Sequence, residues 1–448
     1  MSDRTSGRRA IVIGAGIGGL AAAQVLADHF ERVVVLERDA HAEHGAVRPG
    51  VPQGRHPHVL LSGGCRALVD LFPGIDQDLM DAGAVALDAG YDACHEMPER
   101  FPRRHLGVRT FSLSRPLLET VIRRHVAERD NIVLRGRCRG SEIMRTGDGR
   151  FATGVRCVFG DKGLETLPAE LVVDATGRGA PTLGFLAAIG HPEPAETRIG
   201  VELSYATASL TLPPSAQPDF LALMTIGTPP DGSRAGYLTR IEDDRWLALL
   251  VGRGSDRPPA DRDAFLAYAA RLETPTLHDA IRPARFTGEI ARFGFPESVR
   301  RNFTAAGRLP RGVLPIADTI CRFNPVYGQG MTVALQEACI LQRLLRAGPG
   351  RPDAIATLGQ DFLVEAEALL DGPWAMSALP DLAYPQTTGP RPADLQNLLR
   401  FQIALGRVAM CDPAVHKLLW EVRHLLRPLA ALQDPALVRR AQAEMAAA

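Results

Sequence analysis

The order of apolar and polar residues predicts a strand-turn-helix-strand unit at the start of the chain. A β-branched run over residues 10–13 is followed by an Ala- and Leu-rich helical segment and by a second β-branched run over residues 33–36. Two short apolar runs around a helical pattern are typical of neighbouring parallel strands joined by a crossover helix. We therefore expect an α/β lobe in the N-terminal part.

The pattern then becomes rich in strands. Long apolar and β-branched runs over residues 198–253 and 285–303 predict one larger, mainly antiparallel sheet, interrupted by a helix over residues 261–271. Residues 311–347 return to a strand followed by a long amphipathic helix, so we expect them to rejoin the first lobe. Between the first lobe and the large sheet we expect short helices over 65–72 and 77–80, strands and turns over 84–111, a helix over 112–128 capped by Ser114, and strands over 131–173.

The last part of the chain, residues 352–448, has a helical period throughout. One apolar stripe lies opposite charged residues and predicts a helix face that packs in a core. Docking of this stripe on a membrane surface is the alternative. The stripe consists of Val415, Leu418, Leu419, Val422, Leu425 and Leu426.

Composition limits the class of protein. The 448 residues, 46% of them hydrophobic, suffice for two or three domains with a substantial core. Lys plus Arg and Asp plus Glu both number 51, so no net charge indicates nucleic acid or an anionic membrane as a partner. The seven cysteines are scattered without metal-ligand spacing and indicate reduced thiols and no metal site. The glycine-rich run over residues 11–27 fits the nucleotide fingerprint, and no other segment offers about 18 uninterrupted apolar residues. We therefore expect a cytoplasmic protein without stable membrane insertion.

Candidate chemistry begins with the glycines between the first strand and its helix. Gly14, Gly16 and Gly19 have the spacing G-x-G-x-x-G, and Glu37 follows the second strand. The first glycine permits a tight turn, the second lets a pyrophosphate approach the backbone, and the third lets the helix pack closely, while the acid accepts hydrogen bonds from an adenosine ribose. This pattern predicts a dinucleotide site; a glycine-rich turn of an unrelated α/β protein is the alternative. The predicted site also includes the neighbouring residues Ile17, Gly18 and Arg38.

A proline-rich loop over residues 41–64 follows and is rich in hydrogen-bond donors. We interpret it as a loop that covers the cofactor, with a solvated surface loop as the alternative. His56 and His58 do not read as a metal pair, because no third ligand or carboxylate lies nearby in the sequence. The basic residues of the loop are Arg48, Arg55, His56 and His58.

Three later segments can also bring backbone or charge to a ligand. Asp174 ends a buried strand and precedes two glycines in a turn, Gly177 and Gly179. Asp318 also follows a strand, and the glycine pair after it precedes a long helix whose first N–H groups are free. Arg115 begins an earlier helix, where it can pair bidentately with a pyrophosphate.

Together these stretches resemble the flavin-dependent monooxygenases with the para-hydroxybenzoate hydroxylase fold. The resemblance extends from the N-terminal glycines to the helix over residues 311–347. One departure is Ala317, where the family has a glycine before the Asp. The motifs after the glycine fingerprint are Asp174-Ala175-Thr176-Gly177-Arg178 and Asn324-Pro325-Val326-Tyr327-Gly328-Gln329-Gly330-Met331.

The resemblance implies FAD as the cofactor and a role for each matching residue. Glu37 would bind the adenosine ribose, Arg48 and Arg115 the pyrophosphate or ribityl region, and Asp318 the ribityl chain. The pyrimidine edge of the flavin would face the backbone N–H groups of Gly328, Gln329, Gly330 and Met331.

Within the family, the strings VPQGRHPHVLLSGG and SRPLLE are most similar to bacterial epoxidases that act on the polyene chains of polyether antibiotics. Squalene epoxidases are more distant relatives. The implied fold class is α/β (α+β), with a Rossmann-like FAD-binding domain, a mainly antiparallel β-sheet substrate domain and a C-terminal helical region. We expect the FAD-binding domain in residues 1–190 and 304–347, the substrate domain in 191–303 with a contribution from 84–111, and the helical region in 348–448.

The implied activity is that of an FAD-dependent monooxygenase. It would insert one oxygen atom from O2, through a flavin C4a-hydroperoxide, into a lipophilic natural product, with epoxidation of a polyketide or terpenoid alkene as the favoured reaction. Because this chemistry needs positioning and a dry cavity but no side-chain nucleophile, we assign no catalytic residue, Tyr327 included. NAD(P)H or a separate flavin reductase would supply electrons.

Other functions fit the same fold. They are an aromatic hydroxylase, an FAD-dependent reductase of prenyl double bonds and a flavin-binding module without turnover. A flavin halogenase is not expected. Halogenases of this fold carry a Trp-x-Trp-x-Ile-Pro string and a lysine early in the chain, whereas here Trp246, Trp374 and Trp420 lie far apart in sequence and the first lysine is Lys162.

Overall fold

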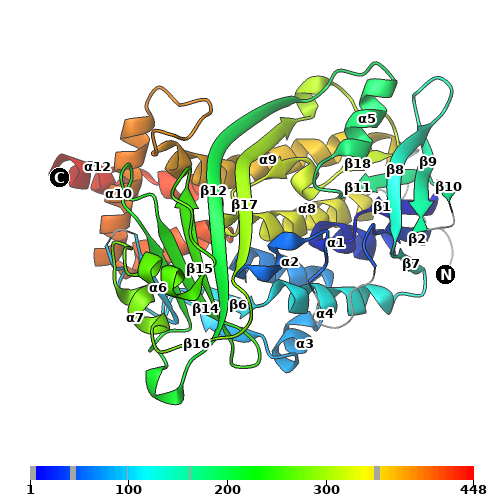
Figure 1. Cartoon of the computed structure of the whole chain (residues 1–448). Coiled ribbons are helices and arrows are strands. Elements are labelled where there is room, and N and C mark those ends of the chain that lie inside the picture. The colour runs from blue at the N-terminus through cyan, green and yellow to red at the C-terminus, as the bar shows by residue number, and fades with distance from the viewer. Residues whose placement is uncertain (1–6, 41–46, 98, 161–162, 348–353, 448) are drawn as a thin grey trace.

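The computed structural model describes residues 7–40, 47–97, 99–160, 163–347 and 354–447. Figure 1 shows an α/β lobe around β1 and α1, a large sheet beside it with the long strands β12 and β17, and the C-terminal helices α10 and α12 at the far side of that sheet. The first residues of the loop over 41–64 and Lys162 lie outside the described residues.

A five-stranded parallel sheet forms the centre of the α/β lobe. Its order is β18-β11-β1-β2-β7, so the segment after residue 311 returns to the first lobe as predicted. In register, Ile13 pairs with Leu36 and Asp174, and Asp174 pairs with Pro315. The carboxyl ends of four strands therefore meet at one edge, where open parallel sheets bind ligands. The strands are β1 (Gly7–Ile13), β2 (Phe30–Leu36), β7 (Ile132–Arg135), β11 (Leu171–Asp174) and β18 (Val313–Pro315).

Helices cover this sheet and bury its apolar strands. The Ala- and Gly-rich helix α1 is almost completely buried and contacts α8 and α4. Ser114 caps α4 as predicted, because its hydroxyl accepts the N–H of Leu117. The helices of this lobe are α1 (Ile17–Leu26), α2 (Ser62–Leu71), α3 (Ile75–Asp81), α4 (Arg115–Ala127), α5 (Ala180–Ala188), α8 (Gln329–Arg346) and α9 (Ala354–Leu382).

Two small antiparallel sheets extend the lobe. One has the order β10-β9-β8 and confirms the strands expected over 131–173. The other has the order β3-β6-β4 and includes a short strand from the proline-rich loop, which the sequence did not predict. Their strands are β3 (His58–Leu60), β4 (Val85–Asp88), β6 (Arg109–Leu113), β8 (Cys138–Arg145), β9 (Ala152–Phe159) and β10 (Leu164–Pro168).

The predicted large sheet has the order β19-β17-β12-β15-β14-β13-β5, with β16 also paired to β12. It is antiparallel except between β13 and β5, and β5 comes from the segment 84–111. On β15, alternate residues face opposite layers: Leu250 packs with Phe265 of α6, whereas Val251 packs toward α9 and α10. The elements are β5 (Ala93–Glu96), β12 (Ala195–Thr211), β13 (Ala222–Ile226), β14 (Ala235–Arg240), β15 (Trp246–Arg253), β16 (Arg285–Phe286), β17 (Ala291–Asn302), β19 (Cys321–Arg322), α6 (Arg262–Ala269) and α7 (Thr276–Ile281).

The C-terminal part is helical as predicted. The apolar stripe on α11 packs in a core with α10 and with β4, since Val415, Leu419 and Val422 are buried beside Leu405 and Leu87. The stripe therefore faces the protein interior. No helix among the described residues has the length and apolar character that crossing a bilayer requires. The helices here are α10 (Leu395–Cys411), α11 (Pro413–Arg423) and α12 (Pro435–Ala447).

We expect Phe362→Ala on α9 to destabilise the α/β lobe strongly. Phe362 is 0% exposed in the core that α9 shares with β18 and α8, so its removal should lower the free energy of unfolding by about 3–5 kcal/mol. Val364→Ala on the same helix is the matched control, because Val364 is 55% exposed. Urea unfolding measures both, and similar losses would contradict the assigned core face.

Candidate functional site

One cavity of about 1980 Å³ lies at the shared edge of the parallel sheet and extends to the large sheet and the C-terminal helices. The predicted site residues come from four stretches, namely residues 14–38, the loop at Arg48, the helix start at Arg115 and residues 318–331, and all of them line it. They are Gly14, Gly16, Ile17, Gly18, Gly19, Glu37, Arg38, Arg48, Arg115, Asp318, Gly328, Gln329, Gly330 and Met331. Because ordinary ligand pockets have volumes of about 300–1,000 Å³, this cavity has room for a large cofactor and a second molecule.

The three fingerprint glycines have different surroundings. Gly14 has a φ of +104°, in the left-handed region that favours glycine. A Cβ at Gly19 would lie 2.0 Å from the carbonyl oxygen of Gly14, so only glycine lets α1 lie this close to β1. A Cβ at Gly16 would meet nothing within 4 Å. The space beside Gly16 is therefore open to a ligand, while the other two glycines are needed for the fold itself.

Two helices begin at the cavity without a side-chain cap. The N-caps are Gly16 for α1 and Gly328 for α8, and neither can offer a side chain to the first N–H groups. Those N–H groups and the positive end of the helix dipole favour an electron-rich ligand. The site therefore offers two separate places for anionic or carbonyl oxygens.

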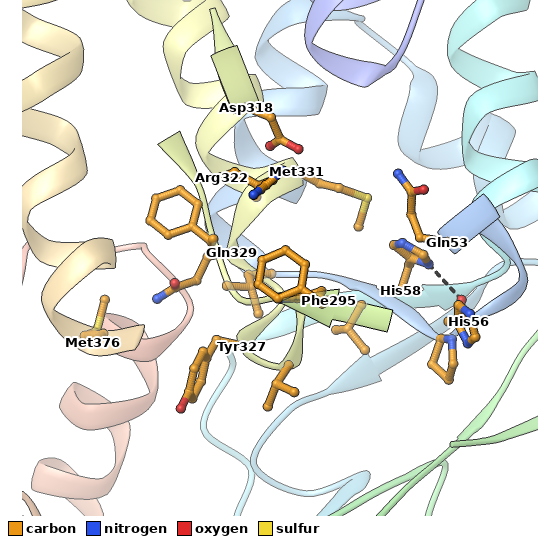
Figure 2. Close-up of a pocket in the computed structure, with 18 of the residues that line it drawn as sticks. Gln53, His56, His58, Phe295, Asp318, Arg322, Tyr327, Gln329, Met331 and Met376 are labelled. Carbon is orange, nitrogen blue, oxygen red and sulfur yellow. Dashed lines mark hydrogen bonds between the residues drawn. The ribbon is translucent and has the colours of Figure 1, made fainter. Parts of the chain in front are cut away.

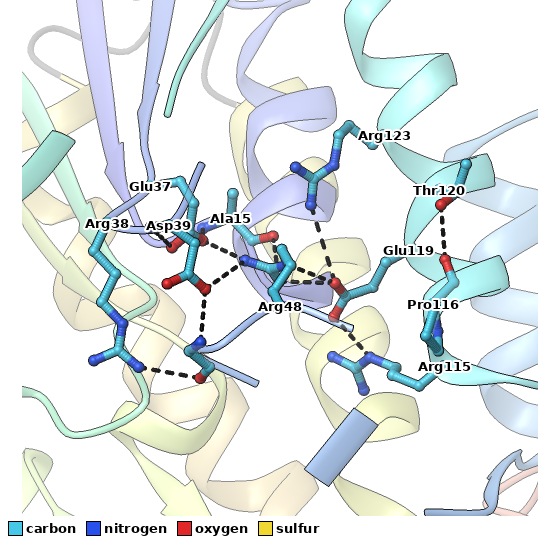
Figure 3. A network of polar contacts seen from close by, with 11 residues as sticks. Ala15, Glu37, Arg38, Asp39, Arg48, Arg115, Pro116, Glu119, Thr120 and Arg123 are labelled. Carbon is cyan, nitrogen blue, oxygen red and sulfur yellow. Dashed lines mark hydrogen bonds and ion pairs between the residues drawn. The ribbon is translucent and has the colours of Figure 1, made fainter. Parts of the chain in front are cut away.

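Arg48 bridges two acids beside α1 (Figure 3). Its Nη1 donates to Glu37 Oε2 at 2.7 Å, and its Nε and Nη2 donate to Glu119 Oε2 at 3.0 and 2.7 Å. The other carboxylate oxygen of Glu119, Oε1, accepts a hydrogen bond from Nε of Arg115 at 2.8 Å. Glu37 also accepts the N–H groups of Ala15 and Asp39. The network ties the proline-rich loop to α1, β2 and α4.

This network changes the role expected for Arg48, which was predicted to bind the pyrophosphate or ribityl region. The side chain is buried, and burial alone would lower the pKa of its guanidinium, but Glu119 and Glu37 outweigh this and raise it. Burial alone would raise the pKa of Glu119, but Arg115 and Arg48 hold it below its ordinary value. Arg48 is thus an ion-paired clamp that holds Glu37, and its charge is already balanced within the protein. Sequence reasoning did not name Glu119 as a site residue, although it ends the string SRPLLE that carries the resemblance.

Asp318 points into the cavity from the turn after β18 (Figure 2). Its carboxylate accepts no hydrogen bond from the described part of the chain, and burial raises its pKa although Arg322 and Arg115 oppose the shift. The preceding Ala317 has a φ of +59°, so the backbone keeps a glycine-like conformation despite the substitution. Glu337 of α8 fixes this turn by accepting the N–H of Ala317 at 2.6 Å. An unpaired carboxylate at a fixed turn fits a ligand with hydroxyl groups.

The adjoining wall of the cavity carries two histidines (Figure 2). His58 donates through Nδ1 to the carbonyl oxygen of His56 at 2.7 Å, and Nδ1 of His56 lies 2.7 Å from Oγ1 of Thr207. Burial, assisted by Arg55 and Arg115 respectively, lowers the pKa of His56 to about 4 and that of His58 to about 3. Both imidazoles are therefore neutral and weakly basic at physiological pH. Nowhere in the described ranges do three His, Cys, Asp or Glu side chains gather to hold a metal.

Tyr327 lines the cavity, but its hydroxyl is committed elsewhere. It donates to Oδ1 of Asp381 at 3.1 Å, and the same carboxylate pairs with Arg253 at 2.8 Å and accepts both hydrogen bonds from the Asn324 amide. The cluster joins the turn before α8 to β15 and to the end of α9. Sequence reasoning missed Asp381 and Arg253, because contacts between distant segments leave no local pattern.

Comparison with known proteins adds to this geometry. Residues 12–62 match the NAD(P)-binding Rossmann-like domain family. Over 399 residues the chain is 31% identical to Protein Rv3254 of Mycobacterium tuberculosis, an alignment that covers 85% of this chain and 81% of that protein.

Solved structures with a similar fold include two flavin enzymes. The flavin-dependent brominase Bmp2 superposes with a TM-score of 0.67 at 16% identity and covers 98% of this chain and 99% of its own. PqsL of Pseudomonas aeruginosa, a probable FAD-dependent monooxygenase, superposes with a TM-score of 0.59 at 16% identity and covers 84% and 97%. These likenesses confirm the predicted fold class.

We expect His56→Gln to reduce the acid sensitivity of the fold. Because the pKa of His56 falls to about 4 on folding, the unfolded chain binds its proton first, and stability is lost as pH falls from about 6.5 toward 4. This one residue should account for roughly 2 kcal/mol of the loss between pH 7 and pH 5. Urea unfolding at both pH values measures it, and equal losses in variant and wild type would contradict the burial of a neutral imidazole.

Proposed function

Since this chain belongs to the family of the mycobacterial Protein Rv3254 and has the fold of flavin-dependent monooxygenases, we propose that it is an FAD-dependent monooxygenase. The observation that carries the proposal is that four separate stretches of sequence meet around one cavity. They are residues 14–38, the loop at Arg48, the start of α4 at Arg115 and residues 318–331. We further propose that its substrate is a lipophilic natural product and that it forms an epoxide at an alkene of a polyketide or terpenoid.

The polar groups of the cavity fit FAD in kind and in position along the sheet edge. The uncapped start of α1 and the open space beside Gly16 would take the pyrophosphate, and Glu37 the adenosine ribose. The unpaired carboxylate of Asp318 would accept the ribityl hydroxyls. The uncapped start of α8, residues 329–331, would face the pyrimidine carbonyls.

Two arginines named from the sequence would act differently from each other. Arg48 would hold Glu37 in place for the ribose, because its own charge is neutralised by Glu37 and Glu119. Arg115 donates one N–H to Glu119 and lines the cavity, so its remaining N–H groups would bind the pyrophosphate or ribityl region.

When bound and reduced, FAD supplies the activation of O2 for transfer of one oxygen atom. The chain's own residues bind and orient the substrate and exclude water. The side chains between the predicted flavin site and the C-terminal helices are mainly apolar, which suits an alkene. They include Leu87, Leu223, Leu249, Phe293, Phe295, Met376, Leu379, Leu399 and Leu405.

The two cavity histidines favour epoxidation over hydroxylation of a phenol. Phenol hydroxylation gains from a base that removes the phenolic proton. His56 and His58, with pKa values lowered to about 4 and about 3, are poor bases for that step. An alkene requires no such base. Aromatic hydroxylation and the reduction of prenyl double bonds remain the alternatives that the experiment below separates.

We do not propose halogenation as the reaction, although the fold is similar to that of a brominase. Lysine is present at positions 162 and 417 only. Lys417 is exposed on α11, and no lysine of the described chain lines the cavity. The site therefore lacks a described lysine that could relay a halogenating species.

Labelled oxygen tests the proposed reaction. With FAD, 18O2 and either NADPH or a separate flavin reductase with NADH, the protein should place one 18O atom in a product from a panel of polyenes, terpenoids and phenols. Comparing the two electron sources shows which one the enzyme uses. Product formed without O2 would instead indicate a double-bond reductase, and oxygen consumption absent with every reductant would indicate a binding module.

Replacement of Gly16 tests where the pyrophosphate lies. Gly16 has φ −73° and ψ 179°, which any residue can adopt, so Gly16→Val should fold normally but fill the open space and abolish FAD retention. Gly184→Val is the control, because Gly184 also has open space beside it and lies outside the cavity. Flavin absorbance after gel filtration and a thermal melt report both properties. Bound FAD in Gly16→Val would refute this placement.

A further inference from the structure

Arg423, at the end of α11, lines the same cavity among the C-terminal helices. Its one hydrogen bond within the described chain goes to the thioether sulfur of Met97 at 4.0 Å, and it forms no ion pair with a described carboxylate. Arg48 and Arg253, in contrast, both pair with acids; they are buried, whereas Arg423 is half-buried and faces the cavity. Arg423 is therefore a cation whose counter-charge is missing from the described protein.

Aromatic rings hold this guanidinium in place. Its central carbon lies 5.1 Å from the ring centre of Trp420 and 5.8 Å from that of Phe101. Trp420 is itself fixed, because its indole N–H donates to the carbonyl oxygen of Ala89 at 3.3 Å. These cation–π contacts use the charge of the guanidinium and none of its N–H groups, so the N–H donors other than the one facing Met97 are available to a ligand.

The next residue, His424, adds a second donor to the cavity lining. Its Nδ1 accepts the backbone N–H of Ser62 at 3.3 Å, so the proton of the neutral ring lies on Nε2. Burial, with His95 and Arg423 nearby, lowers the pKa of His424 to about 3, which keeps the ring neutral. Burial likewise lowers the pKa of Arg423 to about 10, which leaves it charged at physiological pH. The pair therefore presents one positive charge and one neutral N–H.

We propose that Arg423, assisted by His424, binds a carboxylate of the substrate. The substrate is then an amphipathic acid that is held by its polar end. An unpaired cation in an apolar wall costs free energy that an anionic ligand offsets. A carboxylate matches the single charge and the planar donor edge of the guanidinium, whereas a phosphate carries more charge than this one cation balances. The inference rests on the proposed function and specifies the class of its substrate.

Binding of linoleate and of methyl linoleate to the FAD-loaded enzyme tests this site without turnover. The two probes share one hydrocarbon chain and differ in the carboxylate. Tryptophan fluorescence, with Trp420 beside Arg423, gives the dissociation constants. Wild-type protein should bind linoleate about tenfold or more tightly than the ester, as expected for hydrogen bonds to charged groups.

Three variants identify the residue responsible. Arg423→Gln should weaken linoleate binding about tenfold or more and leave the ester unchanged, while Arg423→Lys should restore part of the preference. Arg427→Gln is the control, because Arg427 is exposed, pairs with Glu421 and lies outside the cavity lining. Flavin content and a thermal melt confirm that each variant is folded.

Several outcomes would overturn the inference. They are a wild-type protein that does not prefer linoleate to its ester, an Arg423→Gln variant that keeps the preference, and tighter binding of dodecyl phosphate than of linoleate. If Arg423→Gln does not fold, the same comparison in Arg423→Lys decides, because an unchanged preference there would show that the planar donor edge is not used. Labelled-oxygen transfer with no carboxylate preference would overturn this inference alone and leave the proposed function standing.

Discussion

The parallel register of β18, β11, β1 and β2 is the constraint on which the site depends. Because backbone hydrogen bonds fix Ile13 beside Leu36 and Asp174, and Asp174 beside Pro315, the turns that follow these strands must meet at one edge. The close approach of Gly19 to Gly14 then seats α1 on that edge. The open backbone, the acids and the helix ends of the cavity all follow from this arrangement.

Arg48 and Arg253 differ from Arg423 in how their charges are balanced. Arg48 lies between Glu37 and Glu119, and Arg253 pairs with Asp381, so these buried cations are compensated inside the protein. Such pairs cost desolvation and fix the loop, the helices and the large sheet in one arrangement. Arg423 has no such partner in the described chain. Arg48 and Arg253 therefore hold the structure together, whereas Arg423 is available to a ligand.

The cavity draws on parts of the chain that local sequence does not connect. The α/β lobe provides the turns at one end, and the large sheet provides a wall through β12, β15 and β17. The C-terminal helices α10 and α11 close the remaining side. A polar region at the sheet edge and an apolar region beside the large sheet and the C-terminal helices therefore belong to one continuous cavity, as the proposed reaction between a cofactor and a lipophilic molecule requires.

The sequence by itself determined the features that depend on local physics. The glycine spacing, the run of buried strands, the Ser114 cap and the returning strand-helix unit each follow from backbone freedom, periodicity or a short-range hydrogen bond. Only the tertiary structure decided that Arg48 is neutralised by Glu119, that Asp381 holds Tyr327, and that Arg423 has no acidic partner among the described residues. The first two are contacts between side chains 71 and 54 residues apart in the sequence, and such contacts are set by packing, which leaves no local pattern in the sequence.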